Sequence, residues 1–155
     1  MSWSDRRNLL AGLGALALAG CGFRPAYAPG GTGRTLQGRV RAADPVTRAD
    51  FQFLTALEER LGRPEAARFD LAYRITVGRI DGTTRVLLTG RADYTLTEGG
   101  AERARGQVVA ETAFSTTATQ LASQAAEDDA ELRLMRMLAD SVVQRLLADP
   151  ALAAE

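Results

Sequence analysis

The sequence predicts an α+β fold, a two-layer α/β sandwich of about four mostly antiparallel strands with two helices covering one face. Two observations carry this prediction. Three long segments in the middle of the chain alternate apolar and polar residues, which is typical of a sheet with one buried face. Two other segments repeat apolar residues at helical spacing and can cover that face. The expected order is strand, helix, strand, strand, strand, helix.

The N-terminal segment predicts export and lipidation. Two arginines precede an apolar run over residues 9–19, which is shorter than the ~20 residues that a membrane-spanning helix needs. The run ends in Leu-Ala-Gly-Cys at residues 18–21, the form of a bacterial lipobox, and Cys21 is the only cysteine of the chain. We therefore expect a signal peptide over residues 1–20 and a covalent lipid on Cys21. The alternative is an ordinary signal peptide followed by a buried free cysteine.

A lipidated cysteine would attach the mature protein to a membrane, because two or more acyl chains hold a protein stably there. Gly22 follows the cysteine, where an Asp commonly retains lipoproteins in the inner membrane. The sequence thus predicts an outer-membrane protein anchored on the periplasmic side. Arg6 and Arg7 fit two export routes: they are either the plain basic start of a signal peptide or part of a twin-arginine signal.

The mature chain has the length of one domain with a single modest core. Residues 21–34 are rich in Gly and Pro and predict a flexible tether, which leaves residues 35–155 for the domain. Residues 35–41 alternate weakly and predict a short first strand. A helix separates this strand from the others, so it can lie parallel to a neighbour. Its place in the sheet stays open.

The first helix is predicted to follow the break at Asp44 and Pro45. Thr47 can cap it, and Asp50 places negative charge in its first turn. Gly62 and the proline after it end the element. The expected buried face carries four residues at helical spacing: Phe51, Leu54, Leu57 and Leu61.

Three strands in an antiparallel meander are predicted next. Asp81-Gly82 and Gly99-Gly100 supply the turns between them. The residues expected on the covered face alternate along each strand: Phe69, Leu71, Tyr73, Ile75 and Val77; Val86, Leu88, Gly90, Ala92, Tyr94 and Leu96; Ala104, Gly106, Val108, Ala110, Thr112 and Phe114.

A long helix over about residues 123–148 is predicted to end the domain, followed by Asp149 and Pro150. Three acidic residues at 127–129 lie near its start, where the helix dipole favours negative charge. That placement explains them without a metal or a catalytic role. The core-facing stripe is expected to run through Ala130, Leu134, Leu138, Val142 and Leu146.

The composition excludes several kinds of chemistry. The chain has no His, so it has no Ser-His-Asp triad, Cys-His pair or histidine-bound zinc. The sequence predicts no enzyme, no metal and no cofactor apart from the lipid on Cys21. The net charge of zero argues against a general nucleic-acid binder. Charge is nevertheless polarised, with fourteen Arg against ten acids over residues 24–105 and three Arg against eight acids over residues 106–155.

Cys-Gly-Phe-Arg-Pro stands at residues 21–25, and further fragments follow it in order at residues 51–53, 57–62, 71–75, 84–85, 94–96, 126–131 and 138–139. Together these fragments cover nearly all of the mature chain, and they resemble the LptE family of lipopolysaccharide-assembly lipoproteins in its alphaproteobacterial form. No long polar tail follows the last helix, unlike some enterobacterial relatives.

The resemblance implies a plug subunit inside the lumen of the outer-membrane barrel LptD, which assists barrel assembly and lipopolysaccharide delivery to the cell surface. The alternative is a generic lipoprotein accessory of another envelope assembly machine. The resemblance also implies lipopolysaccharide binding, and guanidinium groups suit its phosphates. The candidate residues lie on the polar sides of the strands, where they could equally be solvated charges: Arg74, Arg85, Arg91, Arg103 and Arg105.

Overall fold

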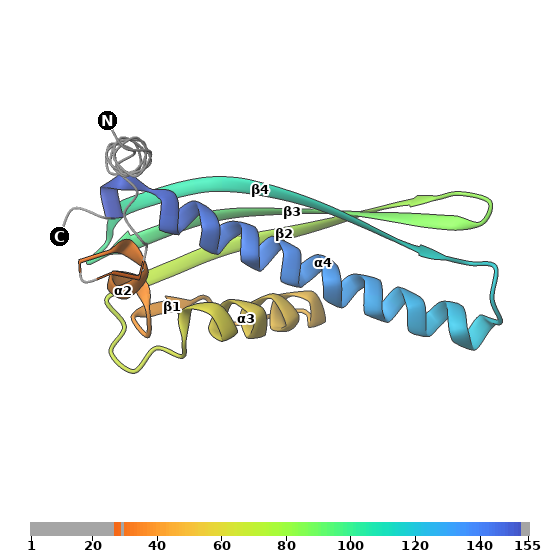
Figure 1. Ribbon diagram of the computed structural model, residues 1–155, viewed down its shortest axis with the longest axis horizontal. Helices are drawn as coiled ribbons and strands as arrows, with labels where there is room; N and C mark the ends of the chain where they lie inside the picture. Colours follow the sequence, from red (N-terminus) through yellow and green to blue (C-terminus); the bar gives the residue numbers. More distant parts are fainter. Residues whose placement is uncertain (1–26, 29, 153–155) are drawn as a thin grey trace, which may run out of the picture.

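Four strands form one sheet, and two long helices lie against one of its faces (Figure 1). The computed structural model describes residues 27–28 and 30–152, so Cys21, the predicted signal peptide and half of the predicted tether lie outside the described residues. The strands are β1 (Val40–Ala42), β2 (Phe69–Asp81), β3 (Arg85–Glu98) and β4 (Ala101–Ser115), and the long helices are α3 (Arg48–Leu61) and α4 (Gln120–Ala148). The predicted α+β two-layer architecture is confirmed.

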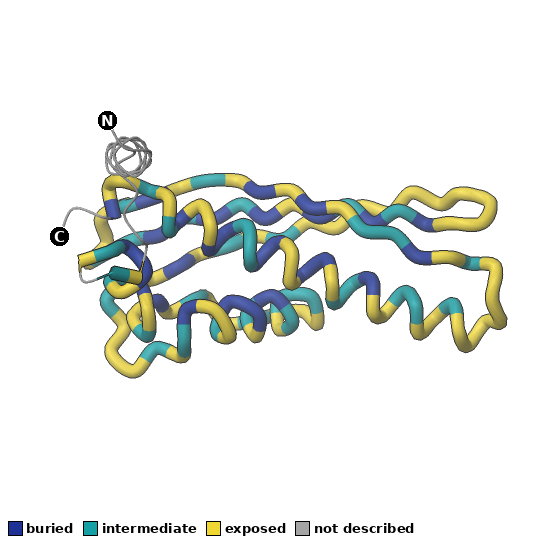
Figure 2. The backbone as a smooth tube through the Cα atoms, viewed as in Figure 1, coloured by how far each residue is buried: buried dark blue, intermediate teal, exposed yellow. Residues whose placement is uncertain are grey.

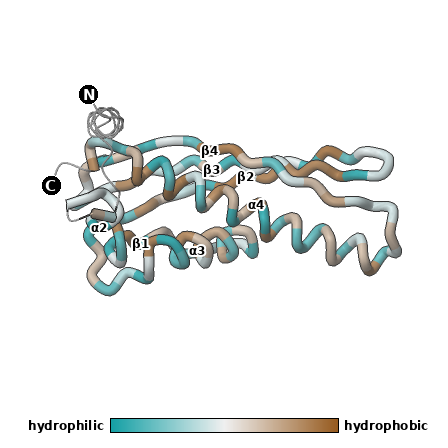
Figure 3. Tube along the Cα trace, viewed as in Figure 1, coloured by the Kyte–Doolittle hydropathy of each residue, from teal (hydrophilic) through white to brown (hydrophobic). Residues whose placement is uncertain are grey.

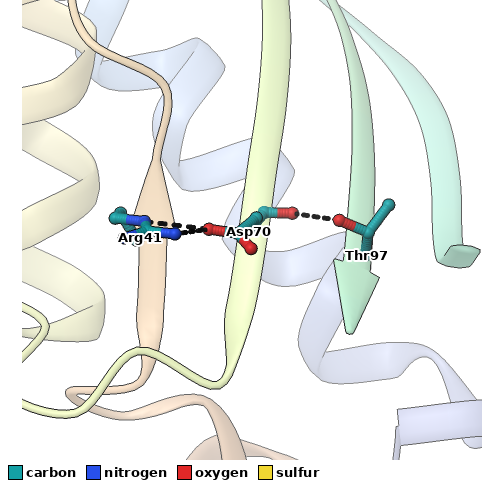
Figure 4. A network of polar contacts seen from close by, with 3 residues as sticks. All are labelled: Arg41, Asp70 and Thr97. Atoms are coloured by element: carbon teal, nitrogen blue, oxygen red, sulfur yellow. Dashed lines mark hydrogen bonds and ion pairs between the residues drawn. The ribbon is translucent and has the colours of Figure 1, made fainter. Parts of the chain in front are cut away.

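The strand order in the sheet is β1-β2-β3-β4. The three long strands form the predicted antiparallel meander, and Gly99 and Gly100 both adopt positive φ in the turn between β3 and β4. The short strand β1 pairs with the start of β2 and is parallel to it, which fixes the position that the sequence left open. Arg41 on β1 donates two hydrogen bonds to Asp70 Oδ1, at 2.9 and 2.6 Å, and Thr97 on β3 donates to the Asp70 carbonyl at 3.3 Å (Figure 4).

A short helix, α2 (Thr32–Leu36), lies where the sequence predicted the end of the tether and the start of the first strand. The prediction of a strand over residues 35–41 is therefore wrong for residues 35–39, because β1 begins only at Val40, and residues 32–34 belong to the folded domain. Gly38 has φ +68°, and this left-handed residue turns the chain from α2 into β1. Leu36 is fully buried, so the predicted inward position holds although the backbone is helical.

Helix α3 begins as predicted with a capping box. The Thr47 hydroxyl accepts from the Asp50 amide at 3.1 Å, and the Asp50 carboxylate accepts from the Thr47 amide at 2.9 Å. The predicted buried face is partly wrong, because Phe51 is exposed and Phe53 is fully buried instead. Phe53 packs against Tyr73 on β2 with ring centroids 4.9 Å apart. The helix is therefore rotated from the predicted stripe, and Phe51 faces solvent.

Helix α4 crosses the middle of the sheet at Gly90 on β3. A Cβ atom on this glycine would lie 2.9 Å from Leu138 Cδ1 and 3.0 Å from Leu134 Cγ, so the two leucines occupy the space that a side chain would need. Tyr94 fills the other glycine position on this face by covering Gly106. The predicted stripe of α4 is confirmed, since all five of its residues are buried. The helix begins three residues earlier than predicted.

The covered layer is uneven along the sheet. Buried residues concentrate in the half that α3 and α4 share, while the turn between β2 and β3 is exposed (Figure 2). Val77 was predicted to face the core but is 44% exposed, because α3 does not extend over this end of β2. Hydrophobic residues nevertheless recur into the β2–β3 hairpin, where Ile80 is exposed (Figure 3). We call this end of the sheet the distal end.

Candidate functional site

The sheet face opposite the helices carries mostly polar side chains, and we call it the open face. It is formed by the even-numbered residues of β2 and the odd-numbered residues of β3 and β4, as the register requires. Its central members are Ala72, Arg74, Thr76, Thr89, Arg91, Asp93, Thr95, Arg105, Gln107, Val109 and Glu111.

Asp93 lies at the centre of the open face beside two arginines. Arg74 on β2 is directly opposite Asp93, and Arg91 lies two residues away along β3. Opposed residues are about 5 Å apart and residues two apart along a strand about 7 Å. The three charges therefore form one patch. Neither Arg74 nor Arg91 forms an ion pair with another residue in the described part of the chain.

Gln107 fixes the carboxylate of Asp93 from the other side. It is opposite Asp93 on β4, and its Nε2 donates to Asp93 Oδ1 at 2.6 Å. This hydrogen bond occupies one carboxylate oxygen and holds it on the β4 side, away from Arg74. No local pattern predicted this contact, because it depends on the register between two strands.

A shallow depression of about 640 Å³ lies over the same residues. Arg74, Asp93, Arg105 and Gln107 all line it. Arg105 also donates to Glu102 at 2.7 Å, but both side chains are exposed, so this ion pair adds little stability and can rearrange. The depression therefore offers guanidinium donors to an anion at the surface.

The other two predicted arginines do not join this group. Arg103 lies near the start of β4, beside the register shift at Leu96 and Thr97 on β3. Its Nε is 3.3 Å from Glu98 Oε2. Glu98 also pairs with Arg68, so two guanidinium groups share this carboxylate. Arg85 begins β3 at the distal end, six residues and about 20 Å along the strand from Arg91.

Arg85 lines a separate hollow of about 370 Å³ at the distal end, together with Ser115 and Thr117. It forms no ion pair with another described residue. The structure therefore divides the five candidate arginines into three places: a central group of Arg74, Arg91 and Arg105, a paired Arg103, and a distal Arg85.

The described residues contain neither a metal site nor a membrane-spanning helix. No group of three or more His, Cys, Asp or Glu side chains could hold a metal ion within residues 27–28 and 30–152. In the same part of the chain, no helix is both long enough and apolar enough to cross a membrane.

A sheet with one helix-covered face and one polar, arginine-bearing face defines a two-layer α+β domain whose open face can contact anions. The family model described as LptE, Lipopolysaccharide-assembly, matches residues 34–146. The chain therefore belongs to the LptE lipopolysaccharide-assembly family, which confirms the resemblance seen in the sequence. No curated protein sequence matches the chain.

Solved structures share the fold at low sequence identity. A protein from Caulobacter crescentus CB15 is 19% identical with a TM-score of 0.68, over 80% of this chain and 97% of that one. A minor lipoprotein from Acinetobacter baumannii is 14% identical with a TM-score of 0.55, over 71% and 89%. The rare lipoprotein B of Shewanella oneidensis is 12% identical with a TM-score of 0.52, over 70% and 91%. At these identities the likeness concerns the fold.

Proposed function

We propose that this protein is a lipid-anchored, non-catalytic subunit of the outer membrane that occupies the lumen of an LptD-like barrel. In this role it assists assembly of the barrel and delivery of lipopolysaccharide to the cell surface. The family match over residues 34–146 carries the proposal. The open face supports it, because barrel interiors are polar and a plug with a polar face suits them.

The anchor belongs to the same proposal. Two of the structural relatives are named as lipoproteins, and the lipobox at residues 18–21 predicts that this chain is one as well. We propose that the mature chain begins at Cys21 and carries its acyl chains on the periplasmic side of the outer membrane. Intact mass spectrometry of the protein from its native membrane should give a chain that starts at Cys21 with added lipid. A mass without lipid would contradict the anchor.

The partner is tested by isolating the affinity-tagged, full-length lipoprotein from outer membranes at native expression. The LptD-like barrel should accompany it in equal amount, as identified by mass spectrometry. A tagged, unrelated lipoprotein of the same organism serves as the control for carry-over. Recovery of another assembly machine, or of no barrel, would favour the generic lipoprotein accessory instead.

We further propose that the arginines of the open face contact lipopolysaccharide phosphates. Arg74 and Arg91 are the strongest candidates because neither is paired with a described residue and Arg105 stands across the same depression. Replacing Arg74 and Arg91 with Glu should reduce lipopolysaccharide binding in vitro at least tenfold. Arg85→Glu alone tests whether the hollow at Arg85 contributes.

Arg136→Glu is the matched control for this measurement. Arg136 is exposed on α4 and lines a groove beside α3, so this variant has the same charge change on the helix layer as each single change, Arg74→Glu or Arg91→Glu, has on the open face. Its lipopolysaccharide binding should equal that of the unmodified protein. If the variant with both Arg74 and Arg91 replaced binds lipopolysaccharide as well as the unmodified protein, the phosphate contact on the open face is excluded. That result does not bear on the barrel partnership.

A further inference from the structure

Among the described residues, no strand pairs with the outer edge of β4, and this edge has a defined hydrogen-bonding pattern. β4 is the last strand in the order β1-β2-β3-β4 of the described residues. Thr116 donates its amide to the Thr84 carbonyl at 3.0 Å, so even-numbered residues here bond towards β3. Because the two backbone groups of a strand residue point the same way, the odd-numbered residues of β4 present theirs outward.

An independent contact confirms which groups point outward. Arg133 on α4 reaches around the edge, and its Nη2 donates to the Ala113 carbonyl at 3.4 Å. Ala113 is odd-numbered, as the pattern requires. The unbroken register from Ala104 to Ser115 extends the same pattern to Gln107, Val109 and Glu111. Arg133 covers the edge at Ala113, and the stretch around Val109 stays open.

Proteins usually protect such edges with inward-pointing charges, bulges or covering segments. The free part of β2 has this protection, because Arg79 is placed there and pairs with Asp81 at 2.7 Å and with Glu127 on α4. The centre of the β4 edge has instead an apolar residue, Val109, which is 57% exposed. This stretch is therefore suited to pair with an added strand.

A groove of about 530 Å³ runs beside this edge, between β4 and α4. Gln107 and Val109 line one side, and Ser141, Gln144 and Arg145 line the other. A strand added to β4 would point every second side chain into this groove, where Arg145 is exposed and forms no ion pair with a described residue. The remaining side chains of the added strand would lie on the open face. The side chain opposite residue 105 would lie beside the Arg105 guanidinium.

We propose that an extended, acidic segment of a partner protein adds to the outer edge of β4 as an extra strand. Its backbone pairs with residues 107, 109 and 111, and its carboxylates meet Arg105 and Arg145. An apolar residue of the segment covers Val109. This edge is distinct from the arginines proposed to contact lipopolysaccharide phosphates, except that Arg105 borders both. Where the proposed barrel supplies the segment, the inference names one contact within that partnership.

The first test uses a short synthetic peptide as the probe, with Val at the position that covers Val109 and Glu at the positions that face Arg105 and Arg145. It is added to the full-length lipoprotein in detergent, and amide hydrogen exchange is followed residue by residue. Exchange should slow at least tenfold at Gln107, Val109 and Glu111 and change little at the residues between them, which already bond to β3. The same peptide with Lys in place of Glu should bind at least tenfold more weakly. Absence of binding, or binding that leaves these three amides unchanged, would overturn the proposal.

Val109→Pro is the decisive variant because proline removes only an outward amide, and proline is tolerated on edge strands. It should weaken peptide binding at least tenfold, whereas Val109→Thr, which keeps the amide, should bind within twofold of the unmodified protein. Arg105→Glu with Arg145→Glu gives a second test that leaves the backbone unchanged, and it should reverse the preference towards the Lys peptide. Undiminished acidic-peptide binding by Val109→Pro, or an unchanged preference, would contradict the proposed edge.

The barrel measurement separates this inference from the proposed function. If the unmodified protein recovers the barrel and Val109→Pro recovers at most a tenth as much, both are supported. If Val109→Pro recovers the barrel fully, the proposed function stands and the edge contact with the barrel is wrong. If no barrel is recovered at all, the proposed function fails, while the peptide measurement still decides whether β4 accepts an acidic strand.

Discussion

Arg60 on α3 and Asp140 on α4 are joined by two hydrogen bonds, from Nε to Oδ1 at 2.6 Å and from Nη2 to Oδ2 at 3.1 Å. Arg48 and Asp128 repeat the contact at the other end of α3, with Nη1 to Oδ1 at 3.0 Å. Both pairs are separated by 80 residues in the chain, so the two helices run in the same direction and in a fixed register. These bridges hold α3 along α4 where both cover the sheet.

Replacing Arg60 with Ala should lower the stability of the fold slightly, and the loss should shrink as salt is added. The Arg60 side chain is largely exposed and that of Asp140 partly so, and ion pairs in contact with solvent are weak and screened. Chemical denaturation at low and high salt measures the effect. The reversed pair, Arg60→Asp with Asp140→Arg, should recover the loss. An equal loss in both salt conditions would indicate that packing of the Arg60 stem, and not its charge, makes the contribution.

Adding one methyl group at Gly90 should destabilise the protein, because that carbon would overlap Leu138 and Leu134. We expect Gly90→Ala to cost about 1–3 kcal/mol as overpacking and Leu138→Ala to cost about 2–5 kcal/mol as a cavity. The double variant should be more stable than the sum of the two losses predicts, because the alanine at 90 fills part of the space that Leu138 leaves. Denaturant midpoints of the three variants give the coupling, and simple additivity would exclude this contact.

Tyr73 should titrate well above an ordinary tyrosine. Burial raises the pKa of its phenol to about 12, with smaller contributions from the charges of Asp50 and Asp44. The unfolded phenol ionises near pH 10, so the folded state holds this proton more tightly and loses stability as the pH rises from about 10 to about 12. Absorbance titration should show the late transition, and Tyr73→Phe should remove it.

The same substitution tests the hydroxyl as a hydrogen-bonding group. The Tyr73 hydroxyl is buried with no hydrogen-bond partner among the described residues, and its ring contact with Phe53 does not need it. Tyr73→Phe should therefore keep or increase the stability at neutral pH, by up to about 1 kcal/mol. A clear loss of stability at neutral pH would show that the hydroxyl has a partner in solution.

The capping box of α3 should make stability depend on acid. Burial raises the pKa of Asp50, but the hydrogen bonds from the Thr47 side chain and from the Thr47 and Val46 amides outweigh it, so the pKa lies below its ordinary value. Because the folded pKa is depressed, the contribution is present above the unfolded pKa of about 3.9 and is lost as the pH falls through the folded value. The difference between Asp50→Ala and the unmodified protein should thus be present at pH 7 and vanish in strong acid.

Thr47→Ala removes the other half of the box and should cost about 1 kcal/mol at neutral pH. Thr47→Ser is its matched control, since serine keeps the hydroxyl that accepts from the Asp50 amide. Circular dichroism during urea unfolding measures both variants. Equal stabilities of the alanine and serine variants would show that the hydroxyl does not stabilise the helix.

Local patterns in the sequence predicted most of the fold because most elements bury one regular face. Alternation predicted the three long strands and their inward residues, and the cap at Thr47 predicted the start of α3. The face of α3 was partly wrong because Phe51 and Phe53 are both apolar and only the contact with Tyr73 selects Phe53. Helix α2 escaped prediction because its glycines suggested a tether, although Leu36 buries its side chain there.

The sequence predicted which types of residue form the candidate site, but it did not predict which of the arginines lie together. Alternation placed all five arginines on the polar sides of their strands. Their separation depends on strand register, which puts Arg74 opposite Asp93, and on the Glu98 pairing that engages Arg103. Such contacts join residues far apart in the chain, and no local pattern records them. The outward amide of Val109 has the same origin, because the pairing of β4 with β3 fixes its direction.

Because α3 covers only part of the sheet, the two ends of the sheet should differ in how easily they open. In the half of the sheet that both helices cover, amides can exchange only after the packing against α3 and α4 is lost. This half should therefore open as one cooperative unit. The hairpin between β2 and β3 has only α4 beside it, and Ile80 and Val77 remain in contact with water. This end should therefore open locally without unfolding the rest, so the tip of the hairpin can change position while the half covered by both helices keeps its structure.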